Sequence, residues 1–147
     1  MTHMLCRPDI PREQRKLPRS DAAAREQPRL PDGATISRSD LSERAAALLK
    51  VRRLRNELFG RALFGEPAWD MLLALYVATG RGTRVTVSGI AGSECPHTTG
   101  LRWLQALEAE QLVKRVRNCR DKRMSFVELT PQALNALDRL FYDVSII

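Results

Sequence analysis

Apolar residues recur at steps of three and four along most of the chain after residue 37, which is the spacing of an amphipathic helix. The first stripe is made of Leu41, Ala45, Leu48, Val51, Leu54 and Leu58. Ser39 or Asp40 can cap the start of this helix. A second stripe consists of Trp69, Leu72, Leu73 and Tyr76, and Gly80 and Gly82 can end it. Both stripes predict helices that bury one face.

The next part of the sequence predicts a short helix, a tight turn and another helix. Val85 can form a short strand, and Thr86 can cap a short helix with the apolar face Val87, Ile90 and Ala91. Residues 93–96 end in proline and predict a turn. The next helix is predicted over residues 97–111, with the stripe Gly100, Trp103, Leu104 and Leu107. This order predicts a helix-turn-helix.

After residue 111 the periodicity changes. Residues 112–117 and 124–129 are extended segments rich in Val, Leu and Phe, and the polar residues 118–123 join them, which predicts a β-hairpin. Thr130 and Pro131 can begin a last helix, with Leu134, Leu137, Leu140, Phe141 and Val144 as its stripe. The sequence therefore predicts a mainly helical fold with a small β-hairpin, a winged helix-turn-helix of the α+β class.

The first 37 residues differ from the rest of the chain. Five of the eight prolines lie there, with seven basic and five acidic side chains and almost no aliphatic pattern. Such a segment buries too little apolar surface to offset the entropy of ordering it. We expect residues 1–37 to be a flexible basic arm and residues 38–147 to be the folded domain.

Charge and composition narrow the function. The formal charge is +7 and the pI is about 10.0, which indicates a polyanionic partner. No apolar run approaches the roughly 20 residues of a membrane span, and the start has no signal-peptide pattern. Three cysteines and two histidines offer neither a disulfide framework nor a zinc site. We expect a cytoplasmic protein without a cofactor, metal or membrane partner.

The helix at residues 97–111 carries side chains suited to a DNA groove. Its start can offer amide groups to a phosphate. The candidate contacts on this helix are His97, Thr98, Thr99, Arg102 and Gln105. An Arg fork matches guanine, Gln matches adenine, and Thr suits a phosphate or a thymine methyl group. The alternative is that Arg102 and Gln105 only solvate the surface.

The hairpin has the densest charge. Its six basic side chains are Lys114, Arg115, Arg117, Arg120, Lys122 and Arg123, opposed by Asp121 alone. Such density suits phosphates and a narrow minor groove. The alternative is a solvated edge hairpin, where basic residues prevent aggregation. We expect one arginine to fold back onto Asp121 and stiffen the loop.

These segments resemble the MarR-type winged-helix transcription regulators. The resemblance covers roughly residues 40–147 and is carried by residues 63–70, 107–113, 118–123 and 127–130. It implies a winged-helix homodimer, often a repressor and sometimes released by a small ligand. The first and last helices would form the dimer. Gln111 replaces the family's usual glycine, so we expect the preceding helix to end without a left-handed residue, and Asn118 replaces an acidic residue.

The cysteines and tryptophans suggest further roles. Cys95 precedes a helix N-terminus, a position that can lower a thiol pKa, and Cys119 lies in the hairpin loop. Either thiol is a candidate oxidant sensor. Trp69 and Trp103 fit core stripes, and we interpret both as packing residues.

Four functions remain open at this point. The leading hypothesis is a sequence-specific, homodimeric regulator that binds duplex DNA. The alternatives are a DNA-binding accessory or nucleoid-type protein without an effector, and a winged-helix module that binds proteins. An enzyme is disfavoured, because the sequence shows no nucleophile–base pair, metal cluster or phosphate loop.

Overall fold

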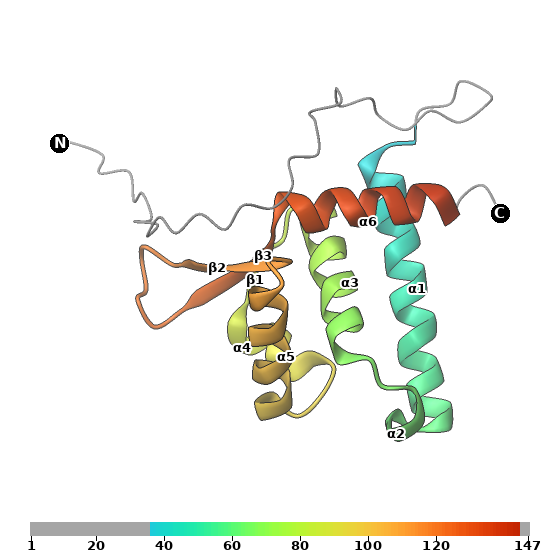
Figure 1. The fold of residues 1–147 in the computed structure, drawn as a ribbon, viewed down its shortest axis with the longest axis horizontal. Coiled ribbons are helices and arrows are strands. Elements are labelled where there is room, and N and C mark those ends of the chain that lie inside the picture. The colour runs from blue at the N-terminus through green and yellow to red at the C-terminus, as the bar shows by residue number, and fades with distance from the viewer. Residues whose placement is uncertain (1–35, 145–147) are drawn as a thin grey trace.

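A computed structural model describes residues 36–144, in which helices pack against one end of a small sheet and the hairpin of that sheet projects beyond them (Figure 1). The helices are α1 (Arg38–Phe59), α2 (Arg61–Phe64), α3 (Pro67–Gly80), α4 (Val87–Ser93), α5 (His97–Ala109) and α6 (Pro131–Asp143). The strands are β1 (Val85–Thr86), β2 (Val113–Arg117) and β3 (Ser125–Leu129). They form an antiparallel sheet in the order β1-β3-β2. This topology is a winged helix, so the predicted fold class is confirmed.

The core lies between α1, α3, α6 and the sheet. In Figure 1, α6 lies across the ends of α1 and α3, and the hairpin, which leads into the start of α6, extends to the left, away from α1. The ring of Tyr76 on α3 stacks on Phe141 of α6 with 5.5 Å between ring centroids. Met71, Leu73 and Leu104 are fully buried. The long helices therefore form a scaffold, and α4, α5 and the hairpin are attached to it as one unit.

The apolar stripe predicted for α1 is only partly correct. Leu41 and Ala45 are buried, but the buried face continues through Leu49, Arg52 and Asn56. Three residues of the predicted stripe are exposed instead of buried: Val51, Leu54 and Leu58 are 64%, 50% and 68% exposed. The face turns toward Arg52 because this arginine forms ion pairs with Asp70 and Glu66 of the α3 segment, at 2.5 and 2.7 Å.

Side-chain caps set the helix starts. Ser37, not Ser39 or Asp40, is the N-cap of α1, and it forms a capping box with Asp40. Ser37 thus lies at the beginning of the folded part, although the sequence assigns it to the arm. Thr86 accepts a hydrogen bond from the amide of Gly89, and Thr130 accepts one from Ala133, as predicted. Residues 1–35, which make up most of the predicted arm, lie outside the described residues.

The C-terminus of α5 contradicts one expectation. Gln111 has a φ of 58°, so it adopts the left-handed conformation without being a glycine. The amide of Leu112 donates to the carbonyl of Leu107, and the amide of Gln111 donates to that of Glu108, both at 3.0 Å. This pattern is a Schellman motif, which satisfies the last carbonyls of the helix. α5 also ends at Ala109, two residues before the predicted bound.

None of the described helices has the length and apolar character that crossing a membrane would require.

Candidate nucleic-acid interface

Helix α4 supports α5 at very close range. Ile90 and Ala91 of α4 are buried, and Gly100 of α5 faces them. A Cβ added at Gly100 would lie 1.8 Å from the carbonyl oxygen of Ala91. Only a residue without a side chain fits there. This contact fixes how α5 crosses α4, and therefore which face of α5 is turned outward.

The outward face of α5 carries the predicted contacts. Gly100, Leu104 and Leu107 are buried, whereas His97, Thr98, Thr99, Arg102 and Gln105 are all exposed. Thr98, Arg102 and Gln105 follow one another at steps of four and three, so they share one helical face. The structure therefore brings this part of the predicted set together on one surface.

Trp103 was wrongly interpreted as a packing residue. Its side chain is 41% exposed, because it lies at the edge of the buried stripe rather than at its centre. It borders the face of Arg102 on the same helix and adds a large apolar surface there. In the sequence, Trp103 stands between the exposed Arg102 and the buried Leu104. This position indicates that it lies at the boundary between the buried and exposed faces of α5.

The hairpin next to α5 is a regular two-stranded ladder. Val113 pairs with Leu129 and Arg117 pairs with Ser125 at the two ends of the register. Because side chains alternate along a strand, Arg117 lies on the same face as Val113 and Arg115. Arg115 forms an ion pair with Glu108 of α5 at 2.9 Å. This pair connects the hairpin to the exposed helix and places Arg117 on the α5 side of the sheet.

The hairpin loop is held by two polar side chains. Asn118 Oδ1 accepts the amide of Arg120 at 3.0 Å, and Asp121 Oδ1 accepts the amide of Arg123 at 2.9 Å. The expected ion pair between an arginine and Asp121 is absent from residues 36–144. The carboxylate is used on the backbone instead, in an Asx-type turn. The loop is therefore ordered without using its cationic groups.

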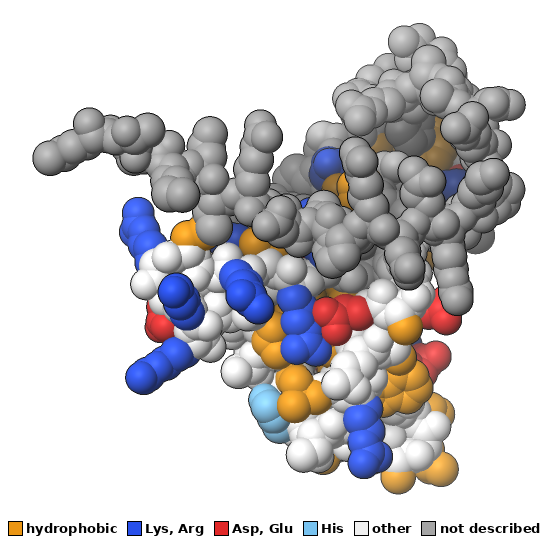
Figure 2. All heavy atoms as spheres, turned by 60° about the vertical axis from the view of Figure 1, so that its left-hand side comes forward, with side chains coloured by type: hydrophobic (Ala, Val, Ile, Leu, Met, Phe, Trp, Pro, Cys, Tyr) orange, Lys and Arg blue, Asp and Glu red, His pale blue; other side chains and the backbone are white. Residues whose placement is uncertain are grey.

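The side chains of five cationic residues in this region make no hydrogen bond or ion pair within residues 36–144, although the backbone amides of Arg120 and Arg123 donate to the loop. The five residues are Arg102 on α5 and Arg117, Arg120, Lys122 and Arg123 on the hairpin. All five are exposed. In Figure 2, Lys and Arg side chains project from the side of the molecule that bears the hairpin. We call these five residues the cationic surface.

Most other arginines of the described chain are already paired. Arg38 binds Asp138 at 2.6 Å, Arg84 binds Glu128 at 3.3 Å, and Arg52 is buried between two carboxylates. Lys114 of the predicted cluster also pairs with Glu128, at 3.7 Å. Lys50 on α1 is unpaired like the five residues of the cationic surface, but it lies on a different helix. The unpaired charge is thus concentrated on α5 and the hairpin.

The local environment of Cys95 opposes the reactivity expected from its position. Burial raises the pKa of the Cys95 thiol, Glu94 acts in the same direction, and Arg61 acts against them. A thiol with a raised pKa is a poorer nucleophile at neutral pH. The argument for an oxidant sensor at Cys95 is therefore weakened. Cys119 is exposed in the hairpin loop.

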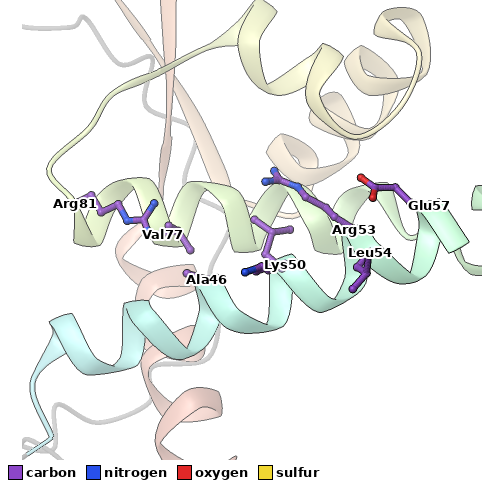
Figure 3. A pocket seen from close by; sticks show the side chains of 8 residues that line it. Ala46, Lys50, Arg53, Leu54, Glu57, Val77 and Arg81 are labelled. Carbon is purple, nitrogen blue, oxygen red and sulfur yellow. The ribbon is translucent and has the colours of Figure 1, made fainter.

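A cavity of about 420 Å³ lies between α1 and α3, on the scaffold (Figure 3). Lys50, Arg53 and Arg81 supply its cations and Glu57 its carboxylate. Its apolar lining is Ala46, Leu49, Leu54 and Val77. The cavity has the size of a small-molecule site.

Among residues 36–144, no group of three His, Cys, Asp or Glu side chains is arranged to hold a metal ion.

No protein-family model matches this sequence, and no curated protein matches it. Among solved structures, the chain is similar to the Q18P mutant of MepR from a multidrug-resistant S. aureus clinical isolate. That similarity has a TM-score of 0.46 and 21% sequence identity, over 76% of this chain and 77% of that chain. A likeness of this size is too weak to carry a functional argument, which therefore depends on the surface described above.

Proposed function

We propose that this protein is a MarR-like transcription regulator that binds duplex DNA in a sequence-specific way, as a homodimer and most simply as a repressor. The observation that supports it is the cationic surface, five exposed and unpaired cations on α5 and the adjacent hairpin. DNA carries a dense row of phosphates, and its affinity for proteins comes largely from such cations. The winged-helix scaffold presents them beside one exposed helix.

In this proposal α5 enters the major groove. Arg102 would donate both arms of its fork to guanine, Gln105 would pair with adenine, and Thr98 would contact a phosphate or a thymine methyl group. His97 and Thr99 lie at the N-terminal end of the helix, where amide groups can meet a phosphate. Exposure of this face supports the assignment, since a base-reading helix must keep these side chains available.

The hairpin would follow the phosphate backbone and reach the minor groove. Arg117, Arg120, Lys122 and Arg123 make no internal ion pair in the described part of the chain. Negative potential is high in a narrow minor groove and attracts arginine. A solvated edge hairpin explains basic strand residues such as Lys114, which has a carboxylate partner. A solvated edge hairpin explains less well the loop at residues 118–123, which is held by Asn118 and Asp121 while its basic side chains have no partner among the described residues.

Two alternatives share the same surface. An accessory or nucleoid-type protein would bind many sequences with similar affinity, and a protein-binding module would require an acidic partner. We infer a cytoplasmic binding protein rather than an enzyme. Selection of bound genomic fragments with purified protein separates these cases. We expect a defined motif with two-fold symmetry, because a symmetric homodimer reads two half-sites.

The roles of the helix and the hairpin can be tested separately. Arg102→Ala is expected to cost about 1–3 kcal/mol on the selected duplex and little on random DNA. Arg120→Ala or Arg123→Ala should weaken binding to both DNAs and lower the salt slope by roughly one per lost phosphate contact. Affinities are measured on both duplexes across a salt series.

Lys50→Ala is the matched control, because Lys50 is an exposed and unpaired cation on α1. Its loss should leave affinity and salt slope nearly unchanged. Equal losses on both duplexes for Arg102→Ala would show that α5 does not read bases. Unchanged binding in all variants would exclude this surface as the DNA-binding site.

A further inference from the structure

The turn between α4 and α5 is attached to helices outside the helix-turn-helix. Glu94 lies in this turn and is 5% exposed. The Arg53 guanidinium from α1 donates through Nε to Oε1 and Oε2 of Glu94, at 3.2 and 3.5 Å, and through its terminal nitrogen to Oε1. Arg61 from α2 donates to the main-chain carbonyl oxygen of the same residue. Side chain and backbone of Glu94 are thus held from two elements.

Burial makes this arrangement more than an incidental surface contact. A buried carboxylate is costly unless it is paired and hydrogen-bonded. Arg53 is its cationic partner and is itself 47% exposed at the side chain, so the pair extends from the turn to the scaffold surface. Movement of the turn away from α1 would break the contact with Arg53 and leave the carboxylate without compensation, and movement away from α2 would break the contact of Arg61 with the main-chain carbonyl. The turn therefore has one favoured position relative to α1 and α2.

The start of α5 depends on that position. Pro96 is the N-cap of α5 and makes no side-chain capping bond, and His97, Thr98 and Thr99 are exposed. Core contacts begin at Gly100 and continue through Leu104 and Leu107. The first three side chains of α5 are exposed and do not hold the helix against the core. On the N-terminal side, the half-buried Cys95 packs against the core, and Glu94, three residues before His97, is the nearest residue held by polar contacts from other elements.

We propose that Glu94, held by Arg53 and Arg61, is a positioning residue that fixes the N-terminal half of α5 for base readout. This role rests on the proposed DNA-binding function. Contacts to base edges require a helix held within a fraction of an ångström, whereas long basic side chains on the hairpin adapt to a phosphate. Loosening the turn should therefore reduce discrimination between sequences more than affinity for DNA in general.

The test compares Glu94→Gln, Arg53→Gln and the double variant with the wild-type chain. We expect each single variant to lower the ratio of affinities for the selected and random duplexes on the order of tenfold. The salt slope should be unchanged, because the hairpin cations remain. The double variant should lose little more than either single variant, since both remove one interaction. Lys50→Gln, one helical turn from Arg53 and without a contact to Glu94, is the control.

Hydrogen–deuterium exchange provides the readout of position. Peptides covering residues 93–99 should exchange severalfold faster in both single variants, and peptides of α3 should not change. Arg53→Lys retains the charge and should restore most of the ratio. A general loss of folding would instead lower binding to both duplexes equally and accelerate exchange in α3.

The outcomes separate the two proposals. If the wild-type chain binds neither duplex, the DNA-binding function fails and the positioning role fails with it. If the wild type discriminates and both single variants keep the full ratio, only the positioning role is wrong. A reduced ratio without faster exchange in residues 93–99 would also overturn it, because the turn would not have moved.

Discussion

Gln111 ends helix α5 in a backbone conformation that glutamine rarely adopts. It is exposed, its φ is 58°, and it stands at the position of the Schellman motif that glycine usually occupies. A side chain in the left-handed region costs roughly 1–2 kcal/mol. The hydrogen bonds of Gln111 and Leu112 to the end of α5 hold this conformation despite the cost. The residue therefore stores a small amount of strain between α5 and β2.

Replacing this residue by glycine should relieve that strain. We expect Gln111→Gly to raise the free energy of unfolding by about 0.5–1 kcal/mol, because the relief exceeds the extra chain entropy of glycine. Urea denaturation measures the change. Gln111→Ala is the control and should give no gain, since alanine keeps the Cβ. Destabilisation by glycine would show that the glutamine side chain itself supports the turn.

Buried charge is what the sequence pattern could not reveal. Arg52 interrupts an apolar helix face, and nothing local identifies its partners Asp70 and Glu66, which are distant in sequence. The predicted stripe therefore continued along Val51, Leu54 and Leu58, all of which are exposed. Side-chain burial decided by tertiary pairing is not encoded in the spacing of apolar residues.

At the scale of elements, the best predictions concerned signals that act within a few residues. Thr86 and Thr130 cap their helices because a hydroxyl reaches an amide three residues ahead. The hairpin was found because strand residues flank a polar loop. α2, with four residues, was not predicted, since so short a helix has no periodicity. Exposure of the candidate contacts on α5 followed from helical spacing, and their role in DNA binding stays a prediction.

The crossing of α4 and α5 gives a prediction at this scale. Gly100→Ala should destabilise the fold by about 2–3 kcal/mol, because the new Cβ would lie 1.8 Å from a backbone oxygen that cannot rotate away. Gly92→Ala is the matched control on α4. Its Cβ would meet only the His97 ring carbon Cδ2, at 3.9 Å, so it should be neutral or stabilising by up to about 1 kcal/mol. Thermal and urea unfolding of the two variants measure the difference.

Equal stability of the two variants would mean that α4 can move away from α5 at little cost. The helix-turn-helix would then be less rigid than the close contact at Gly100 indicates. A stable Gly100→Ala protein that still discriminates between duplexes would contradict the view that this crossing orients the exposed face of α5.

At the scale of the whole molecule, large apolar side chains are exposed on the long helices α1 and α6, which carry none of the five residues of the cationic surface. Val51, Leu54 and Leu58 on α1, Leu140 on α6, and Val144, the C-cap of α6, are between 41% and 68% exposed. These helices are the ones assigned to dimerisation on the MarR resemblance. Exposed apolar side chains on a monomer favour association, because burial removes them from water. Residues 145–147, which extend the apolar C-terminus in sequence, lie outside the described residues.

The last prediction therefore concerns assembly. Sedimentation of the full chain at tens of micromolar should give a particle of twice the 16.6 kDa chain mass. Leu54→Glu together with Leu140→Glu should shift it toward the monomer, because each charge would be buried in the proposed interface. Leu63→Glu on α2 is the control: Leu63 is 79% exposed but lies on neither helix. Its dimer should persist. Dissociation of the dimer by Leu63→Glu alone would show that the interface includes α2 instead. If the wild-type chain is a monomer both with and without DNA, a two-fold symmetric target site is no longer expected.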